Sequence, residues 1–159
     1  MILEKPALEK ALNVDELGDV LDFMRSYADK CHHGKEEELL FPALIDKGVP
    51  TQGCPIGALT GEHSRGRSIV GLLAEGRELL DKGDPSAVET IRKGLEGVVS
   101  LYPNHIWKED FLLFPMTLKV MNTKELSKLG EKFNQLDSEW EIGKIRTYEL
   151  FADDFSEKL

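Results

Sequence analysis

Apolar residues along this chain recur at the three- and four-residue spacing of amphipathic helices, and the alternation typical of strands is nowhere sustained. Glycine and proline clusters interrupt this pattern at residues 47–55 and at Gly83-Asp84-Pro85. The pattern therefore predicts an all-α fold. The expected helices run from Asn13 or Asp15 to about Asp46, from about Ile56 to Lys82, from Pro85 to about Met121, from Asn122 onward, and from a Ser138 cap to about Phe155.

Polar residues fall on the apolar stripes of the three long helices. At about 100° per residue, the first stripe contains His32 and Glu36, and the third contains His105 and Glu109. His63 lies on the stripe of the second helix. The same phases direct a further set away from the interior: His33, Glu37, Glu38, Trp107 and Asp110.

The His-x-x-x-Glu spacing belongs to a repeated segment. Residues 32–42 and 105–115 both read His-x-x-Lys-Glu-acid-x-Leu-Leu-Phe-Pro. Each copy places an imidazole and a carboxylate one helical turn apart on the same face. A buried glutamate must be paired, protonated or metal-bound, because burial of its ionised form without a partner costs on the order of several kcal/mol. Facing Glu/His pairs are how helical bundles hold di-iron sites, and this donor set suits iron, manganese or zinc. The pattern predicts metal ligands at His32, Glu36, His63, His105 and Glu109.

Other interpretations remain open at this stage. Each His/Glu pair could instead be a hydrogen bond within one helix. His33, Glu37 and Asp110 are alternative ligands if the helices are rotated, and Arg67 could orient a carboxylate or lie at the bundle margin. Glu62 is expected to be solvated.

Composition narrows the class of protein. The 159 residues are about one domain long, with 41% hydrophobic and 31% charged residues. A net charge of −9 argues against nucleic acid and anionic membranes as partners. No segment is long and apolar enough for a signal peptide or a membrane span, so we expect a cytoplasmic protein with reduced Cys31 and Cys54.

Three segments in order, Cys31 to Pro42, Gly61 to Arg67 and Asn104 to Pro115, resemble the hemerythrin-like (HHE cation-binding) family. The resemblance covers residues 14–121 and, more loosely, the C-terminal helices. It implies an up-down four-helix bundle around a non-haem di-iron centre, with the five residues above as the matching ligands. Family members bind dioxygen, sense oxygen, iron or redox state, or handle nitric oxide and peroxide.

The sequence departs from the family pattern at two points. The family's first helix contributes a further histidine, but here no histidine precedes His32, and Arg67 stands where oxygen carriers often have another. We therefore expect one domain over residues 1–159 with a truncated first helix. Residues 1–12 would be its remnant, 14–121 the metal-binding helices and 122–159 additional helices. The groove left by that helix would favour a homo-oligomer or be filled by the C-terminal helices, whose apolar residues must be buried: Trp140, Ile142, Ile145, Leu150 and Phe151.

The function expected from the sequence is binding or sensing of dioxygen or a related diatomic or peroxide ligand at two iron ions. A mononuclear iron, manganese or zinc site is the alternative for the cofactor. The alternatives for function are a metal-dependent redox enzyme, peroxidase-like or acting on nitric oxide, and a structural bundle with an incomplete site. No nucleophile–base arrangement supports a hydrolase or transferase, so whether the protein is an enzyme stays open.

Overall fold

A computed structural model describes the backbone of residues 13–157 and the side chains as far as residue 154; the remnant segment expected at residues 1–12 lies outside this range. Helices and turns form the described part, which contains no strand, so the all-α prediction is confirmed. The helical elements are α2 (Val14–Asp22), η1 (Phe23–His33), η2 (Glu36–Leu40), α3 (Phe41–Ile45), α4 (Ile56–Asp81), α5 (Ala87–Lys108), η3 (Glu109–Leu113), α6 (Phe114–Val120), α7 (Thr123–Ser138) and α8 (Lys144–Glu157).

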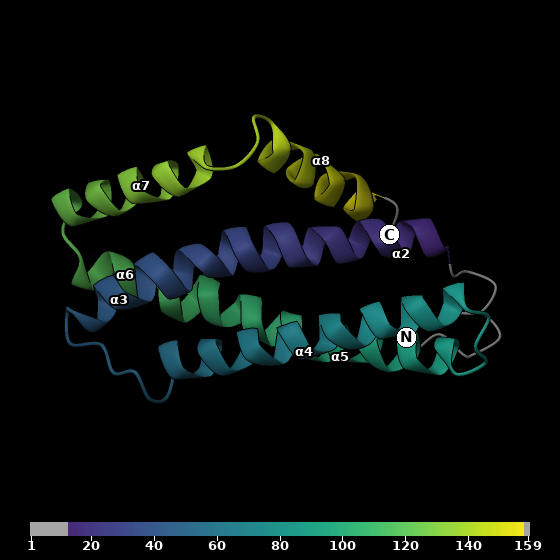
Figure 1. Cartoon of the computed structure of the whole chain (residues 1–159). Helices are drawn as coiled ribbons and strands as arrows, with labels where there is room; N and C mark the ends of the chain where they lie inside the picture. Colours follow the sequence, from purple (N-terminus) through teal and green to yellow (C-terminus); the bar gives the residue numbers. More distant parts are fainter. Residues whose placement is uncertain (1–12, 158–159) are drawn as a thin grey trace.

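The first long helix is continuous from Val14 to Ile45 (Figure 1). Asn13 caps it, as expected, by accepting a hydrogen bond from the backbone N–H of Asp15. Two stretches of this helix, η1 and η2, have π-helical hydrogen bonding, and a third, η3, follows α5 in the other ligand-bearing helix. These π-helical stretches contain or adjoin the residues of the site described below.

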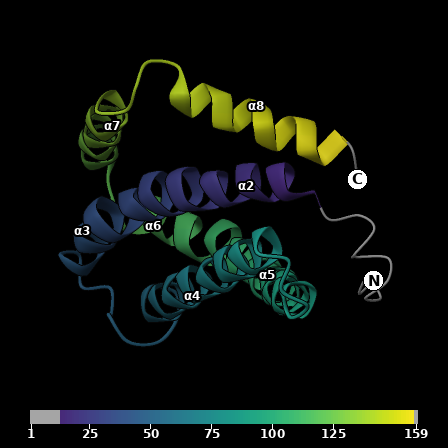
Figure 2. The ribbon, with the colours of Figure 1, turned by 45° about the vertical axis from the view of Figure 1, so that its right-hand side comes forward.

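α4 and α5 form a closely packed antiparallel pair below the first helix (Figures 1 and 2). Gly94 permits the close approach, because a Cβ there would lie 2.5 Å from Leu73 Cδ2. Gly76 has the same role against Ile91, with a Cβ distance of 2.6 Å to Ile91 Cγ1. The pair is joined by a turn at Gly83, whose φ of 68° suits glycine.

Two apolar clusters form the core. One lies at the α3–α6 end and includes Leu44, Leu59 and Leu113, each fully buried. The other lies at the α2 end and includes Leu73 and Ile91. Along each long helix, the predicted ligands occupy the sequence between these clusters, so apolar packing fixes the helices on both sides of the polar residues.

α7 and α8 lie along the side of the first helix opposite α4 and α5 (Figures 1 and 2). α7 begins with a capping box between Asn122 and Glu125. Ser138 ends α7 and does not cap α8, which begins six residues later after Gly143, where φ is 81°. The predicted cap was wrong because a positive-φ glycine turn separates the two helices.

The C-terminal helices bury only part of their apolar surface. Tyr148 is buried, packs against Phe23 and Tyr27, and donates a hydrogen bond to Asp22 Oδ2 (2.8 Å). Ile142 and Leu150, in contrast, are exposed, so the expectation that they are buried was wrong. Ile142 lies in the turn before α8, and Leu150 is not on the α8 face that packs against η1.

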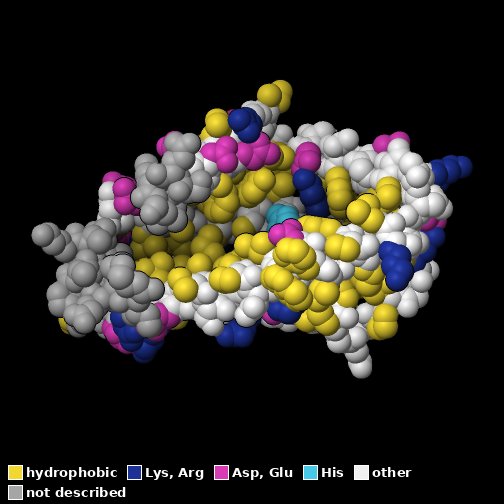
Figure 3. Space-filling model, turned by 180° about the vertical axis from the view of Figure 1, so that it is seen from behind, with side chains coloured by type: hydrophobic (Ala, Val, Ile, Leu, Met, Phe, Trp, Pro, Cys, Tyr) yellow, Lys and Arg dark blue, Asp and Glu magenta, His cyan; other side chains and the backbone are white. Residues whose placement is uncertain are grey.

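An apolar stripe remains on the outer surface of the third long helix. Figure 3 shows hydrophobic side chains around a hollow on this face of the molecule. The exposed members of the third helix are Val99, Ile106, Trp107, Phe111, Phe114 and Leu118. The C-terminal helices therefore leave this surface uncovered. None of the helices in the described range combines the length and the apolar character required to cross a membrane.

Candidate metal centre

The five ligands predicted from the sequence converge in the middle of the bundle. Glu36, His63, His105 and Glu109 are at most 5% exposed. The side chain of His32 is 42% exposed and reaches the same place from η1. The placement agrees with the prediction that three long helices each direct a histidine inward.

A sixth residue, His33, joins them, and its predicted outward orientation was wrong. His33 is 4% exposed, and its ring stacks on that of His63 with the centroids 3.9 Å apart and an angle of 12° between the planes. The prediction assumed a regular α-helix, whereas η1 is π-helical and advances by a smaller angle per residue. As a result the adjacent residues His32 and His33 both reach the interior.

Potential ligand atoms form two groups. One atom from each of His33, His63 and His105 lies within 4.8 Å of the others, and this group is fully buried. A second group, His32, Glu36 and Glu109, meets the same distance limit and is partly open through His32. Three ligands in each group match the number that protein sites with open coordination positions supply.

The two carboxylates connect the groups. Glu36 Oε2 lies 3.2 Å from His63 Nε2, and Glu109 Oε1 lies 2.9 Å from His105 Nε2. Glu109 Oε1 also lies 3.4 Å from His32 Nε2. Each carboxylate thus belongs to the second group by distance and contacts a histidine of the first.

The other ring nitrogen of each buried histidine is held by a carboxylate. His63 Nδ1 donates to Glu37 Oε1 (2.7 Å), and His105 Nδ1 donates to Glu62 Oε2 (3.2 Å). His33 Nδ1 makes the equivalent contact with Asp29 Oδ1 (3.2 Å). A proton on Nδ1 leaves the lone pair on Nε2, directed into the cluster, and this is how ligating histidines are usually fixed.

Glu62 was expected to be solvated, and this was wrong. It accepts one hydrogen bond from His105 Nδ1 and another from Nζ of Lys108 (2.6 Å), the last residue of α5. Because Lys108 supplies the compensating charge, the pKa of Glu62 is lowered even though burial opposes this. Glu37 likewise contacts His63 from outside the cluster and is not among the grouped ligands, and Asp110 is exposed.

Buried atoms without hydrogen-bond partners show that the cluster suits a cation. Among the described residues, five buried side-chain polar atoms have no such partner, and four of them belong to this cluster: Glu36 Oε1, Glu36 Oε2, His63 Nε2 and His105 Nε2. The close Glu36–His63 contact lacks hydrogen-bond geometry. Buried polar groups are normally paired, so acceptor atoms that point at one another without a proton between them fit a metal ion that satisfies them all.

The charges of the metal-free cluster are strongly interdependent. Burial alone would raise the pKa of Glu109, but its close contacts with the ring nitrogens of His105 and His32 outweigh it and lower that pKa to about 2. Burial opposes the charged form of His105, yet the close contact of its Nε2 with the Glu109 carboxylate, followed by that of its Nδ1 with Glu62, raises its pKa. For His32, the hydrogen bond with Glu109 is the main reason that the pKa is raised. Burial, followed by the nearby His63, lowers the pKa of His33 to about 4, so at neutral pH this imidazole carries a free lone pair.

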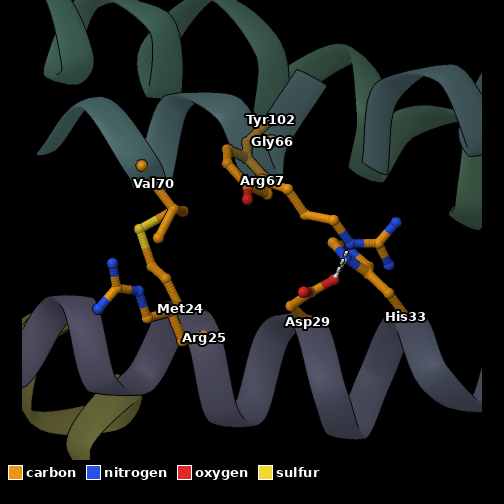
Figure 4. Close-up of a pocket in the computed structure, with 9 residues that line it drawn as sticks. Met24, Arg25, Asp29, His33, Gly66, Arg67, Val70 and Tyr102 are labelled. Carbon is orange, nitrogen blue, oxygen red and sulfur yellow. Dashed lines mark hydrogen bonds and ion pairs between the residues drawn. The ribbon is translucent and has the colours of Figure 1, made fainter. Parts of the chain in front are cut away.

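Two openings lead to the cluster. A cavity of about 210 Å³ lies beside His33, between η1 and α4, with Val70 and Tyr102 in its wall (Figure 4). The hollow in Figure 3 exposes a histidine next to a carboxylate. Of the four histidine side chains, that of His32 is 42% exposed and the other three are at most 5% exposed, so His32 is the histidine that solvent reaches.

Helices that surround buried imidazole and carboxylate donors define a bundle protein of the cation-binding class. The match to known families gives the same result: the hemerythrin HHE cation-binding domain matches residues 2–117. The chain therefore belongs to the hemerythrin HHE family, as its three motif segments indicated.

Similar proteins add no assigned activity. An uncharacterized protein of Mycobacterium bovis is 24% identical over 117 residues, which is 74% of this chain and 45% of that protein. Two uncharacterized proteins of Mycobacterium tuberculosis match to the same extent. The chain thus spans less than half the length of these relatives. No solved structure matches it significantly.

Sequence reasoning missed several residues that hold the ligands in place. Asp29 stands four residues before His33, a spacing that marks a helical contact once His33 is known to point inward. Glu62 and Lys108 act across a helix interface, so no spacing within one helix could have paired them. The expectation that Arg67 orients a carboxylate is confirmed by its hydrogen bonds to Glu37 and Asp29.

Proposed function

We propose that this protein is a hemerythrin-like, non-haem iron protein that binds two iron ions. His33, His63 and His105 would hold one ion, and His32 the other, with Glu36 and Glu109 shared between them. The observation behind this proposal is the set of buried Glu36, His63 and His105 atoms that lack hydrogen-bond partners and point at one another. The mixed imidazole and carboxylate donors fit iron, as they also fit manganese or zinc.

We further propose that the centre binds or senses dioxygen or a related species such as nitric oxide or peroxide. When bound, a ferrous pair would supply two electrons to such a ligand. The chain's own contribution is to hold three imidazoles with their Nε2 lone pairs inward and to limit water. The cavity of about 210 Å³ beside His33 has room for a small diatomic or peroxide ligand.

A cytoplasmic location is part of the same proposal. Cys31 and Cys54 are both free thiols, and Cys31 is buried. Free thiols fit a reducing compartment, in which ferrous iron is also available.

Metal analysis of protein reconstituted with Fe(II) under anaerobic conditions tests the first step. We expect two iron ions per chain in the wild type, a reduced number in His32→Ala and a larger loss in His63→Ala. Glu38→Gln, which changes an exposed neighbour of Glu36, should bind iron like the wild type. A folded wild-type protein that takes up no Fe(II) in equilibrium dialysis would contradict the proposal.

Optical spectroscopy tests the second step. Addition of dioxygen, nitric oxide or peroxide to the iron-loaded protein should give a new absorption band, which His105→Ala loses. Removal of the gas should restore the starting spectrum if the role is reversible binding. Sustained consumption of peroxide would identify a redox enzyme instead. No spectral response to any of the three ligands would leave iron binding intact and refute the ligand assignment.

A further inference from the structure

Arg67, which extends from α4 one turn after His63, joins two carboxylates of the first helix. Its Nε donates to Asp29 Oδ1 (2.8 Å), and its Nη2 donates to Glu37 Oε2 (2.9 Å) and Oε1 (3.0 Å). Figure 4 shows Arg67 and Asp29 beside His33 at one end of the cavity. The guanidinium therefore uses different nitrogens for two acidic residues that lie eight positions apart.

Each of these carboxylates also holds a buried histidine. Asp29 Oδ1 contacts His33 Nδ1, and Glu37 Oε1 contacts His63 Nδ1. Asp29 Oδ1 therefore contacts both Arg67 and His33. Glu37 Oε1 likewise contacts both Arg67 and His63. One cation is thus connected to two imidazoles through one intervening carboxylate each.

The two imidazoles are themselves stacked, with ring centroids 3.9 Å apart. Rotation of either ring about its χ2 angle would disturb the other, because the rings are almost parallel. His105 belongs to a separate arrangement, in which Glu62 is the carboxylate that contacts the ring and Lys108 is the cation that donates to this carboxylate. Arg67 is accordingly the shared support of His33 and His63 only.

We propose that Arg67 is a positioning residue that fixes the tautomer and ring orientation of His33 and His63 together. The inference rests on the proposed metal binding, in which both histidines are ligands. A planar guanidinium can donate to two carboxylates at once, whereas a lysine ammonium is a point charge on a flexible stem. An arginine at this position therefore does what a lysine cannot.

The alternative role for Arg67 is a simple ion pair between helices. Its side chain is 42% exposed, and isolated exposed ion pairs contribute little to stability. A pair of this kind would not control the protonation of a buried ring nitrogen. The tautomers of His33 and His63 therefore separate the two roles.

The first experiment uses the metal-free protein. Long-range ¹H–¹⁵N NMR of the histidine side chains should show His33 and His63 protonated at Nδ1 in the wild type and in Arg65→Ala, which alters an exposed arginine of the same helix. In Arg67→Ala and Arg67→Lys, these two rings should become mixtures of tautomers, while His105 should keep its state. Unchanged tautomers in both Arg67 variants would overturn the inference.

The second experiment measures affinity for Zn²⁺, which avoids redox chemistry, by competition with a chelator. Removal of an outer hydrogen-bond partner usually weakens metal affinity by about 10- to 100-fold, and we expect this loss in Arg67→Ala and Arg67→Lys. Glu37→Gln should weaken binding too, and the Arg67→Ala/Glu37→Gln double variant should lose less than the product of the single losses, because Arg67 acts partly through Glu37. Full affinity in Arg67→Lys would overturn the requirement for a guanidinium.

The results distinguish a failure of the proposed function from a failure of the inference about Arg67. A wild-type protein that binds neither Zn²⁺ nor Fe(II) would refute the proposed function, and the NMR result would still decide whether Arg67 orders the histidines. A wild-type protein that binds metal with the same affinity as a folded Arg67→Ala variant would refute the inference and leave the function intact. If Arg67→Ala does not fold by circular dichroism, Arg67→Lys retains the charge and serves in its place.

Discussion

Replacement of Glu36 by glutamine should make the metal-free protein more stable and should reduce the stabilisation that the protein gains from metal binding. The Glu36 side chain is 4% exposed, and neither carboxylate oxygen has a hydrogen-bond partner. Its nearest cationic candidate is His63, whose Nε2 lies 3.2 Å away without hydrogen-bond geometry. Glutamine keeps the shape of the side chain and removes the charge.

The magnitude follows from two opposing terms. Burial of an ion costs several kcal/mol (roughly) even after relaxation, whereas an unpaired neutral polar group costs about 1–3 kcal/mol. We therefore expect Glu36→Gln to raise the free energy of unfolding of the metal-free protein by about 1–3 kcal/mol. With metal at about 1,000 times its Kd, the wild type gains about 4.1 kcal/mol. A variant that binds about 100-fold more weakly gains only about 1.4 kcal/mol under the same conditions.

Urea denaturation followed by circular dichroism, with a chelator and then with excess Zn²⁺, measures both terms. Glu38→Gln is the matched control, because Glu38 is exposed two residues away and should change neither value. A Glu36→Gln variant that is less stable than the wild type without metal and gains as much from Zn²⁺ would refute the reasoning. That result would mean that Glu36 is satisfied within the protein and needs no cation.

Three further predictions concern packing and charge. Gly94→Ala should destabilise the protein by about 1–3 kcal/mol in urea denaturation, because the new Cβ would overlap a leucine of α4, whereas Gly71→Ala, which meets nothing within 4 Å, should stabilise it by about 0.5–1 kcal/mol. Tyr148→Ala should speed proteolytic cleavage in α8, and Tyr148→Phe, which loses only the hydrogen bond to the first helix, should cost about 0.5–1.5 kcal/mol; equal cleavage rates in all three proteins would contradict the packing described for this helix. In a pH series of unfolding measurements, the metal-free protein should lose stability as pH falls from the usual pKa of Glu109 towards about 2, because the lowered pKa favours folding only while the carboxylate is ionised. It should also lose stability as pH rises above the usual pKa of His105, because the raised pKa favours folding only while the imidazole is protonated. A flat stability profile over that whole range would contradict these shifts.

Periodicity predicted the helices well because each long helix buries one continuous face. The breakers at 47–55 separate the first helix from the second, and Gly83 separates the second from the third, within a few residues of the predicted positions. The last helix was less predictable. Ser138 is a good cap by residue type, but the tertiary path places a glycine turn between it and α8, and no local signal distinguishes the two arrangements.

The site was predictable as far as the helices keep the regular α-helical period. Glu36 and Glu109 were found because each lies one turn after a histidine on a buried face. His33 was not found, because the smaller angle per residue in a π-helical stretch lets the adjacent residues His32 and His33 both reach the interior, and sequence alone does not show where such a stretch begins. The residues that hold the ligands, such as Glu62, depend on contacts between helices and became visible only with the fold.

The difference in exposure between the two ligand groups has a consequence for the order in which ions would come and go. An ion arriving from bulk water can meet His32 directly, whereas the side chains of the three inner histidines are each at most 5% exposed and are approached only through the cavity beside His33. Loading and leaching should therefore be stepwise, with the outer position exchanging quickly and the inner one keeping its ion for longer. A brief chelator pulse should then yield a half-loaded species, a ready preparation for studying one ion at a time.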